Sequence, residues 1–519
     1  MMSSKRLLLH NLPDDVLEHV FAFLPLSDRK SASLVCRLWS ELAFSRRFLS
    51  NVTLQLFRKM KNYQSNYLQR STRRYRNVIV FFESKACQKA EYGFIIKIMN
   101  MFGAELESFH CMVNFSEEQL WNVIARAPQL KQLIVGLDGT TVQQFTFPKL
   151  RYLQDLGSLT NVLRIQSLDA PNLRQLTAIF TNLTDAREST ALLRRQAPQL
   201  KNLELYSTEY FIPIEELQFP KVETLALRER ICATNSDALR TFFKGFVSLR
   251  EVILGFNVGA SDLDVITKTC SSIERLSFKF SAVIPNLFCL LGRLRRLKTL
   301  WLHGVIDSKI TLDCKPLVSV QRLVFQVSKL SGEASVIRGF RQILPNVTDM
   351  NVTLATLSNN DRRNLQVLAQ VCANFSNLKR LTILYADYCM MRCRLSEALN
   401  HLYQLEELTF NHIITNKPME FMWPKRTLKR LRFQNYPYLT DEDLLLMAEV
   451  YPNLKYLELA WCKQVTTAGL DEFRARLPDC VVHRVYPNRL GYENDDITIR
   501  TATEARRLIC ILDRNVVSG

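Results

Sequence analysis

Apolar residues recur along most of the chain in the pattern L-x-x-L-x-L, often with a proline two residues before the first leucine. Clear copies are APQLKQLIV from residue 127, APQLKNLEL from residue 197 and YPNLKYLEL from residue 451. We count about sixteen strong and weak copies, at intervals that average about 25 residues. Three apolar positions match by chance in roughly a few percent of windows, so this pattern indicates a repeat array.

Each repeat contains one predicted strand, and a helix is predicted between successive repeats. In the L-x-L part both leucines point to the same side, because side chains alternate along a strand. Ser116 to Gln119 form a capping box that opens a helix reaching toward Pro128, and residues 361–374 and 441–450 look alike. No single strand and helix can bury its apolar face alone, but stacked copies share one core. The pattern therefore predicts an α/β solenoid.

The N-terminal segment follows a different pattern, with three short amphipathic helices predicted within residues 9–49. Pro13 and the acidic pair after it suit a helix start, and Pro25 ends that helix. Asp28 is predicted to cap the next helix, which carries Trp39. About forty residues cannot bury so much apolar surface alone. The segment is therefore either a helical cap on the following fold or a docking site for another protein.

Three blocks of this segment resemble an F-box, in the family's order and spacing: LPDDVL from residue 12, FAFLPLSD from residue 21 and LVCRLW from residue 34. The resemblance implies docking onto the small adaptor of an SCF ubiquitin ligase and, through it, association with a cullin and a RING subunit. Arg29 stands where the family usually has a leucine, and we expect it to weaken one adaptor contact. By motif position, the residues assigned to the adaptor interface or its immediate support are Leu12, Pro13, Val16, Leu17, Phe21, Leu24, Leu26, Val35, Cys36 and Trp39.

Together, the head and the repeats resemble the F-box leucine-rich-repeat proteins. The last repeats resemble the cysteine-containing subtype, with Cys462 and Thr466 at its characteristic positions, although most earlier repeats lack that cysteine. The resemblance implies an α/β fold in which a three-helix F-box precedes a leucine-rich-repeat horseshoe solenoid, with parallel strands on the concave face and helices on the convex face. We divide the chain into an F-box (1–50), an irregular linker with divergent first repeats (51–104), the repeat array (105–486) and a C-terminal tail (487–519) that either caps the array or folds back across the concave face.

Side chains beside the strand leucines would point out from the concave face, where a target protein could bind. Trp301 is the strongest candidate anchor, because Trp and Arg dominate the binding energy of many interfaces. Each position could instead simply face solvent. Basic residues outnumber acidic ones here, so we expect the target to present an acidic or phosphorylated segment. The predicted target-binding residues are Tyr206, Arg228, Arg275, Lys279, Trp301, His303, Arg322 and Arg380.

The composition of the 519 residues bears on compartment and partner. Thirteen scattered cysteines, an odd number, favour free thiols in a reducing compartment, so we expect the cytoplasm, the nucleus or both. The formal net charge of +18 favours acidic partners of any kind and keeps a nucleic-acid-binding repeat protein as a lower-ranked alternative. No apolar run approaches the roughly twenty residues of a membrane helix, so no membrane partner is expected.

No signature of catalysis or of a cofactor occurs in the sequence. The P-loop, dinucleotide and H-E-x-x-H patterns are absent, and Cys389 and Cys393 lack the second ligand pair that structural zinc requires. We therefore expect a non-catalytic protein that captures a target for ubiquitination, where rate comes from holding that target near the charged enzyme. A regulatory scaffold that uses the same adaptor without directing ubiquitin transfer is the alternative.

Overall fold

The computed structural model of the protein describes residues 12–57, 68, 73–82, 87–137, 149–158, 169–180, 193–207, 217–229, 236–306, 310, 313–330, 334–354, 361–390, 398–414, 425–434, 436–485 and 497–501. The chain forms two compact units. Unit 1 comprises Met1–Leu200, Thr208–Tyr210 and Gly491–Gly519, and unit 2 comprises Lys201–Ser207 and Phe211–Leu490. None of the described helices is both long enough and apolar enough to cross a membrane.

The head of unit 1 is a cluster of short helices: α1 (Asp14–Phe23), α2 (Leu26–Ala32), α3 (Arg37–Ala43) and the single-turn α4 (Arg46–Leu49). The predicted cap at Asp28 is wrong. Pro25 takes the N-cap position of α2, which places Asp28 inside the first turn. The chain then turns at residues 33–36, and Cys36 starts α3 because its Sγ accepts the backbone N–H of Trp39 at 3.4 Å.

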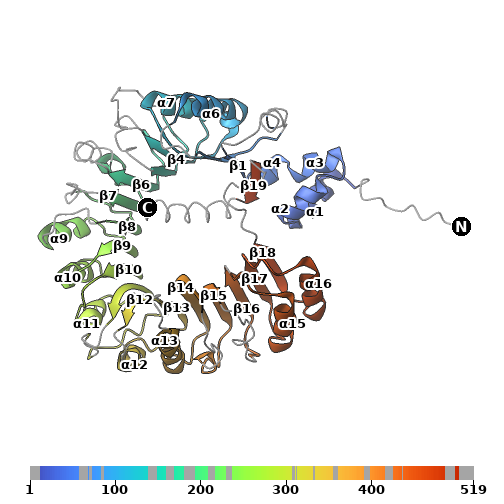
Figure 1. Ribbon diagram of the computed structural model, residues 1–519. Helices are drawn as coiled ribbons and strands as arrows, with labels where there is room; N and C mark the ends of the chain where they lie inside the picture. Colours follow the sequence, from blue (N-terminus) through green and yellow to red (C-terminus); the bar gives the residue numbers. More distant parts are fainter. Residues whose placement is uncertain are drawn as a thin grey trace. The chain divides into compact units, whose positions relative to one another are not determined.

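The rest of unit 1 is a sheet with helices along one face (Figure 1). Its strands are β1 (Val52–Phe57), β2 (Asn77–Phe81), β3 (Ser108–Phe115), β4 (Gln132–Leu137), β5 (Asp155–Ser158), β6 (Gln175–Phe180) and β19 (Ile497–Thr501). Its helices are α6 (Lys89–Phe102), η2 (Gly103–Glu105) and α7 (Glu117–Ala125). Neighbours from β1 to β6 pair in parallel, whereas β19 pairs antiparallel with β1. The C-terminal strand therefore satisfies backbone groups that an edge strand would leave unpaired.

Unit 2 repeats one strand-based module along a curved parallel sheet. Its strands are β7 (Asn202–Ser207), β8 (Thr224–Leu227), β9 (Glu251–Asn257), β10 (Arg275–Phe280), β11 (Thr299–Ile306), β12 (Arg322–Leu330), β13 (Asp349–Leu354), β14 (Arg380–Met390), β15 (Glu407–Ile414), β16 (Arg430–Gln434), β17 (Tyr456–Ala460) and β18 (Val481–Val485). Its helices are α9 (Ser236–Lys244), α10 (Ala260–Thr269), α11 (Leu287–Leu291), α12 (Ala334–Ile343), α13 (Asp361–Asn374), α15 (Asp441–Val450) and α16 (Thr467–Arg476). Neighbouring strands pair in parallel, and the helices lie along the outer side of the arc (Figure 1). The predicted fold class, a helical head before an α/β solenoid, is confirmed.

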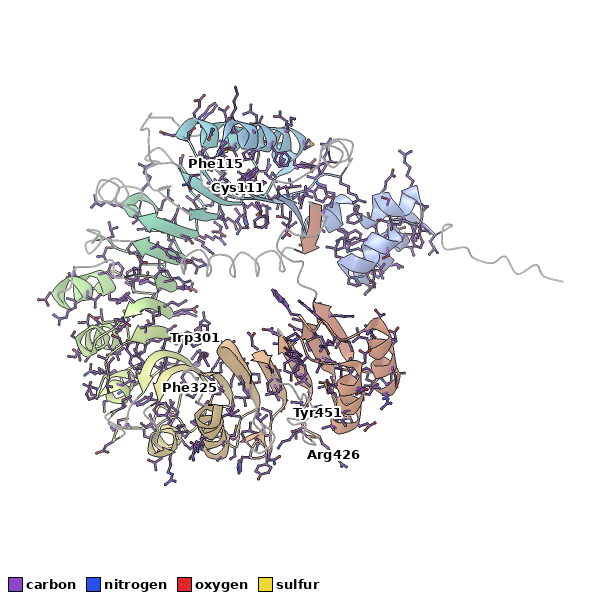
Figure 2. All side chains as sticks on the ribbon, viewed as in Figure 1. Cys111, Phe115, Trp301, Phe325, Arg426 and Tyr451 are labelled. Atoms are coloured by element: carbon purple, nitrogen blue, oxygen red, sulfur yellow. The ribbon has the colours of Figure 1, made fainter. Side chains whose placement is uncertain are left out.

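In-register pairing places one apolar residue of each repeat in the same buried row. Leu276, Leu300 and Leu323 are opposite one another on β10, β11 and β12, and each is at most 1% exposed. Trp301 and Phe325, labelled in Figure 2, occupy β11 and β12. Phe325 is buried, whereas Trp301 is half-buried. Alternation along each strand therefore separates a core side from an open face.

Helix boundaries follow the capping residues that the sequence indicated. Ser116 Oγ accepts the backbone N–H of Gln119 at 3.2 Å, and Gln119 Oε1 accepts the backbone N–H of Ser116 at 3.0 Å. This capping box opens α7, as predicted. The helices predicted over residues 361–374 and 441–450 are observed as α13 and α15.

A glycine substitution tests the close pairing of β10 and β11. A Cβ atom at Gly304 on β11 would overlap the carbonyl oxygen of Phe280 on β10. Gly304→Ala should therefore push the strands apart and lower the free energy of unfolding by about 1–3 kcal/mol. Gly93, exposed on α6, has open space around it, so Gly93→Ala should raise that free energy by about 0.5–1 kcal/mol. Urea denaturation of the full-length variants measures both, and equal stabilities would contradict the pairing.

Candidate binding surfaces

Three of the residues assigned to the adaptor site lie inside the head. Leu17 and Phe21 of α1 and Leu26 of α2 are buried. The Phe21 ring packs edge-on against the Trp39 ring, with centroids 5.4 Å apart, which links α1 to α3. These buried side chains hold the head together, so they can support an interface only from beneath. The half-buried members of the predicted set are Leu12, Leu24 and Trp39.

The other side of α1 exposes an apolar stripe. Val16, Val20 and Phe23 are spaced at helical intervals, which places them on one face of the helix, and Phe23 is 76% exposed. We call these three residues the α1 stripe. The sequence prediction included Val16 but missed Val20 and Phe23. The sequence does contain a signal for them, because α1 carries two apolar rows on different sides of one ten-residue helix. One row packs inside the head, so the second row needs another apolar surface to cover it.

The turn between α2 and α3 forms a second exposed apolar group. Leu34 is 86% exposed, and Val35 and Cys36 are exposed beside it. We call residues 33–36 the α2–α3 turn, which the bond from the Trp39 N–H to Cys36 Sγ fixes to α3. Pro13, at the start of α1, is exposed as well. Leu34 was missed by the sequence prediction, although an apolar pair just after a helix end is unusual unless a partner covers it.

The head concentrates the exposed apolar surface of the described chain. Twelve large apolar side chains are exposed among the described residues, and five of them lie within residues 16–35. Single exposed apolar residues are normal, but a cluster marks an interaction surface. The α1 stripe and the α2–α3 turn are therefore the best candidate for a docking site on the head.

The head joins the sheet of unit 1 directly. Only Ser50 and Asn51 separate α4 from β1. Asn77 of β2 donates from its Nδ2 to the carbonyl oxygen of Ser50 at 2.9 Å. The guanidinium of Arg73 lies over the Phe44 ring, 3.8 Å from its centroid. These contacts fix the head on the first strands of the solenoid.

Arg29, the one departure from the F-box pattern, points into the head. We expected it to weaken an adaptor contact, but its side chain is only 8% exposed. Its guanidinium lies 4.8 Å from the centroid of the Phe48 ring on α4. Within the described chain, its Nε and Nη1 have no hydrogen-bond partner, and burial lowers the pKa of Arg29. The arginine at this position therefore affects the packing of α2 against α4, and not an exposed adaptor contact.

The eight predicted target-binding residues share one face of the unit 2 sheet. They occupy alternate positions along the strands, or directly after β8 in the case of Arg228, and their neighbours point into the core. On β10, for example, Arg275 and Lys279 are exposed, whereas Leu276 and Phe278 between them are buried. We call this side the open face of unit 2. The structure thus brings the predicted residues onto one surface, while their role in binding stays a prediction.

Most basic residues of the open face are paired with acidic residues on an adjacent strand. The pairs, with their N–O distances, are Arg228–Glu204 (2.6 Å), Arg275–Glu251 (2.7 Å), Arg322–Asp349 (3.7 Å), Arg380–Asp349 (3.0 Å), Arg430–Glu407 (3.7 Å) and Arg432–Glu458 (3.5 Å). Burial alone would lower the pKa of Arg228, but Glu204 and Tyr206 outweigh it and leave that pKa raised. The basic surplus expected on this face is therefore largely neutralised.

The face of unit 1 has a different chemistry. Ser108 Oγ donates to Gln132 Oε1 at 3.0 Å, and Gln132 Nε2 donates to Asp155 Oδ2 at 2.7 Å, so a polar row crosses β3, β4 and β5. Strands β1 to β6 contain no lysine or arginine. Of these two sheets, only that of unit 2 therefore offers cations along its parallel strands.

Cys462 and Thr466, the residues of the cysteine-containing repeat subtype, have structural contacts. Cys462 is buried, its Sγ lies 3.7 Å from the carbonyl oxygen of Ala460, and burial raises its pKa to about 12. Thr466 Oγ1 accepts the backbone N–H of Gly469 at 3.1 Å and so caps α16. Both residues hold the repeat in place.

The described residues contain no group of three His, Cys, Asp or Glu side chains arranged to hold a metal ion. Cys393 and the side chain of Cys389 lie outside the described part of the chain. The prediction that these two cysteines hold no zinc therefore stays a prediction.

Replacing Arg29 tests the balance of forces inside the head. Each buried donor without a partner destabilises the fold by about 1–3 kcal/mol, whereas a cation over an aromatic ring stabilises it by about 0.5–2 kcal/mol. With two such donors, Arg29→Leu should stabilise the head by about 1 kcal/mol or more, read as slower hydrogen exchange of α1 and α2 in the full-length protein. Arg47 is exposed and lies 5.9 Å from the same ring centroid, so Arg47→Leu should change protection by less than about 0.5 kcal/mol. Faster exchange in Arg29→Leu would refute this balance.

Replacing Asp349 tests the ion pairs of the open face. Asp349 is 7% exposed, between Arg322 and Arg380 on the two adjacent strands. Asp349→Asn should lower the protection of β12 to β14 against hydrogen exchange by about 1–2 kcal/mol, because two cations lose one shared partner. Glu407 is more exposed than Asp349 and faces Arg430 at 3.7 Å, so Glu407→Gln should cost less than about 0.5 kcal/mol. Equal losses would show that burial of the carboxylate does not matter.

Comparison with known proteins agrees with the geometry of the head. A family model described as F-box-like matches residues 9–55. An F-box/kelch-repeat protein of Arabidopsis thaliana is 50% identical over 40 residues, which cover 8% of this chain and only 10% of that protein. Among solved structures, the complex of Rad7 and Elc1 in yeast shows 16% identity and a TM-score of 0.34, covering 65% of this chain and 81% of that chain. A TM-score this low does not establish a shared fold. Both the sequence match and the exposed apolar groups lie on the same helices, and the head of this chain is therefore an F-box-like domain.

Proposed function

We propose that the chain is the substrate-recognition subunit of an SCF-type ubiquitin ligase. The head docks onto the adaptor, which connects to a cullin and a RING subunit, and the open face of unit 2 captures a target protein for ubiquitination. The chain itself is non-catalytic and contributes by holding the target near the ubiquitin-loaded enzyme. It works in the cytoplasm, the nucleus or both.

The F-box-like head with its exposed apolar groups is the observation that carries this proposal. A monomer gains nothing from exposing Phe23, Leu34 and Val35, whereas a partner that covers them would bury substantial apolar area. Beneath these residues, Leu17 and Phe21 give the head a core of its own. The exposed groups can therefore be altered without removing the packing that holds the helices together.

Two alternative functions differ from this one in what the chain would bind or do with its target. A regulatory scaffold would use the same head without directing ubiquitin transfer, and it differs only in the fate of the captured protein. A nucleic-acid-binding protein would need cations free to meet phosphates. The pairing of Arg228, Arg275 and Arg380 with carboxylates leaves little free positive charge on the open face, which speaks against that alternative.

The proposal is tested with a double variant of the α2–α3 turn, Leu34→Asp with Val35→Asp. Because both side chains are exposed, the variant should fold normally and yet bury two carboxylates on docking. We expect adaptor affinity to fall at least about a hundredfold. Affinity purification of the full-length protein from cells, read by mass spectrometry, should show the adaptor, cullin and RING subunit lost while the target remains bound.

A matched control places the same charges outside the head. Val247 and Val318 of unit 2 are similarly exposed, so Val247→Asp with Val318→Asp should leave adaptor binding unchanged. Retention of the adaptor by the head variant would refute docking through this turn. If the adaptor binds but ubiquitin linkage on the co-purified target does not depend on Leu34 and Val35, the scaffold function would replace the ligase function.

A further inference from the structure

A group of five side chains lies near the middle of the open face of unit 2. Trp301 on β11 is opposite Ser277 on β10 and Val324 on β12, and His303, two residues along β11, is opposite Lys279. Paired strands lie about 4.8 Å apart, so these side chains are neighbours. We call them the Trp301 patch.

Trp301 forms the apolar part of the patch. Its neighbours Ser277 and Val324 have short, buried side chains, whereas Trp301 is only half-buried. A ligand side chain can therefore lie against the indole above these short neighbours. Tryptophan in such a place gives a large contact area at low cost in side-chain entropy.

Lys279 forms the charged part of the patch. Among the basic strand residues of the open face, the six arginines are ion-paired, whereas exposed Lys279 has no ion pair within the described residues. Arg275 on the same strand, for comparison, is held by Glu251 at 2.7 Å. An anionic group of a ligand would therefore meet, at Lys279, a charge that no carboxylate of the described residues pairs with.

The spacing of the two parts limits the shape of the ligand. Alternate residues of a strand point to the same side and lie about 6.6 Å apart, which is the step along β11 from Trp301 to His303, the neighbour of Lys279. We propose that the Trp301 patch binds an extended segment of the target in which an apolar side chain and a carboxylate lie two residues apart. This inference rests on the proposed function, because it names the chemistry of the captured target.

A carboxylate fits this patch better than a phosphate does. A phosphoserine carries a charge of about −1.5 to −2 and is usually bound by several arginines. Here the neighbouring arginines Arg275 and Arg322 already face Glu251 and Asp349, which would repel a second negative charge. Lys279 alone suits a group with a single charge.

The test selects short random phage-displayed peptides on the immobilised full-length protein. The unmodified protein should enrich peptides with an apolar residue two positions from Asp or Glu. Lys279→Glu should bind a representative peptide at least about tenfold more weakly, which corresponds to about 1.4 kcal/mol, and should enrich Lys or Arg at the acidic position. Trp301→Ala should lose the apolar preference. If the unmodified protein enriches no such spacing, or if Lys279→Glu selects the same peptides, the inference is wrong.

Controls separate this inference from the proposed function. Lys244→Glu, at the exposed end of α9, and Tyr403→Ala, at another exposed aromatic residue, should select the same peptides as the unmodified protein. A representative peptide with phosphoserine at the acidic position should bind more weakly than its Glu form, and tighter binding would overturn the choice of carboxylate. Adaptor co-purification is measured on the same variants. Adaptor binding without acidic enrichment would refute this inference alone, whereas acidic enrichment without adaptor binding would refute the ligase function alone.

Discussion

Parallel pairing of each strand with the strand of the next repeat is the constraint on which the solenoid depends. Because neighbouring strands begin in one register, equivalent residues in the first part of successive strands form straight rows. Leucines in one row build the buried core, as Leu276, Leu300 and Leu323 show. Charged residues in another row form ion pairs between strands, such as Arg380 with Asp349. A single geometric rule thus provides both the core and the pattern of charge on the open face.

The head is built on the opposite principle. Its helices bury Leu17 and Phe21 but leave a second apolar row, which includes Phe23, in solvent. Nothing within unit 1 that the structure describes covers that row. The two proposed binding surfaces therefore differ in chemistry. The head exposes apolar area to the adaptor, whereas the open face presents a small patch among charged residues that are mostly ion-paired.

Features with a local or periodic origin were predictable from the sequence. The repeat pattern identified the strands and the fold class, and a four-residue capping box identified the start of α7 at Ser116. Features that depend on distant residues were not. Whether Arg29 faces a partner or Phe48 depends on the placement of α4. The pairing of Arg275 with Glu251, 24 residues apart, depends on which residues of two strands lie opposite each other. The pattern of leucines does not show which charged residues will meet.

The single carboxylate of Asp349 between two arginines has a consequence for how such a chain can change in evolution. Unequal recombination readily adds or removes whole repeats, and the leucine core would tolerate either event. Loss of the repeat that carries Asp349, however, would place Arg322 beside Arg380 and set two like charges together across the new junction. The number of repeats in this stretch is therefore limited by the need to keep an acidic residue between the two arginines, as well as by the length of the array.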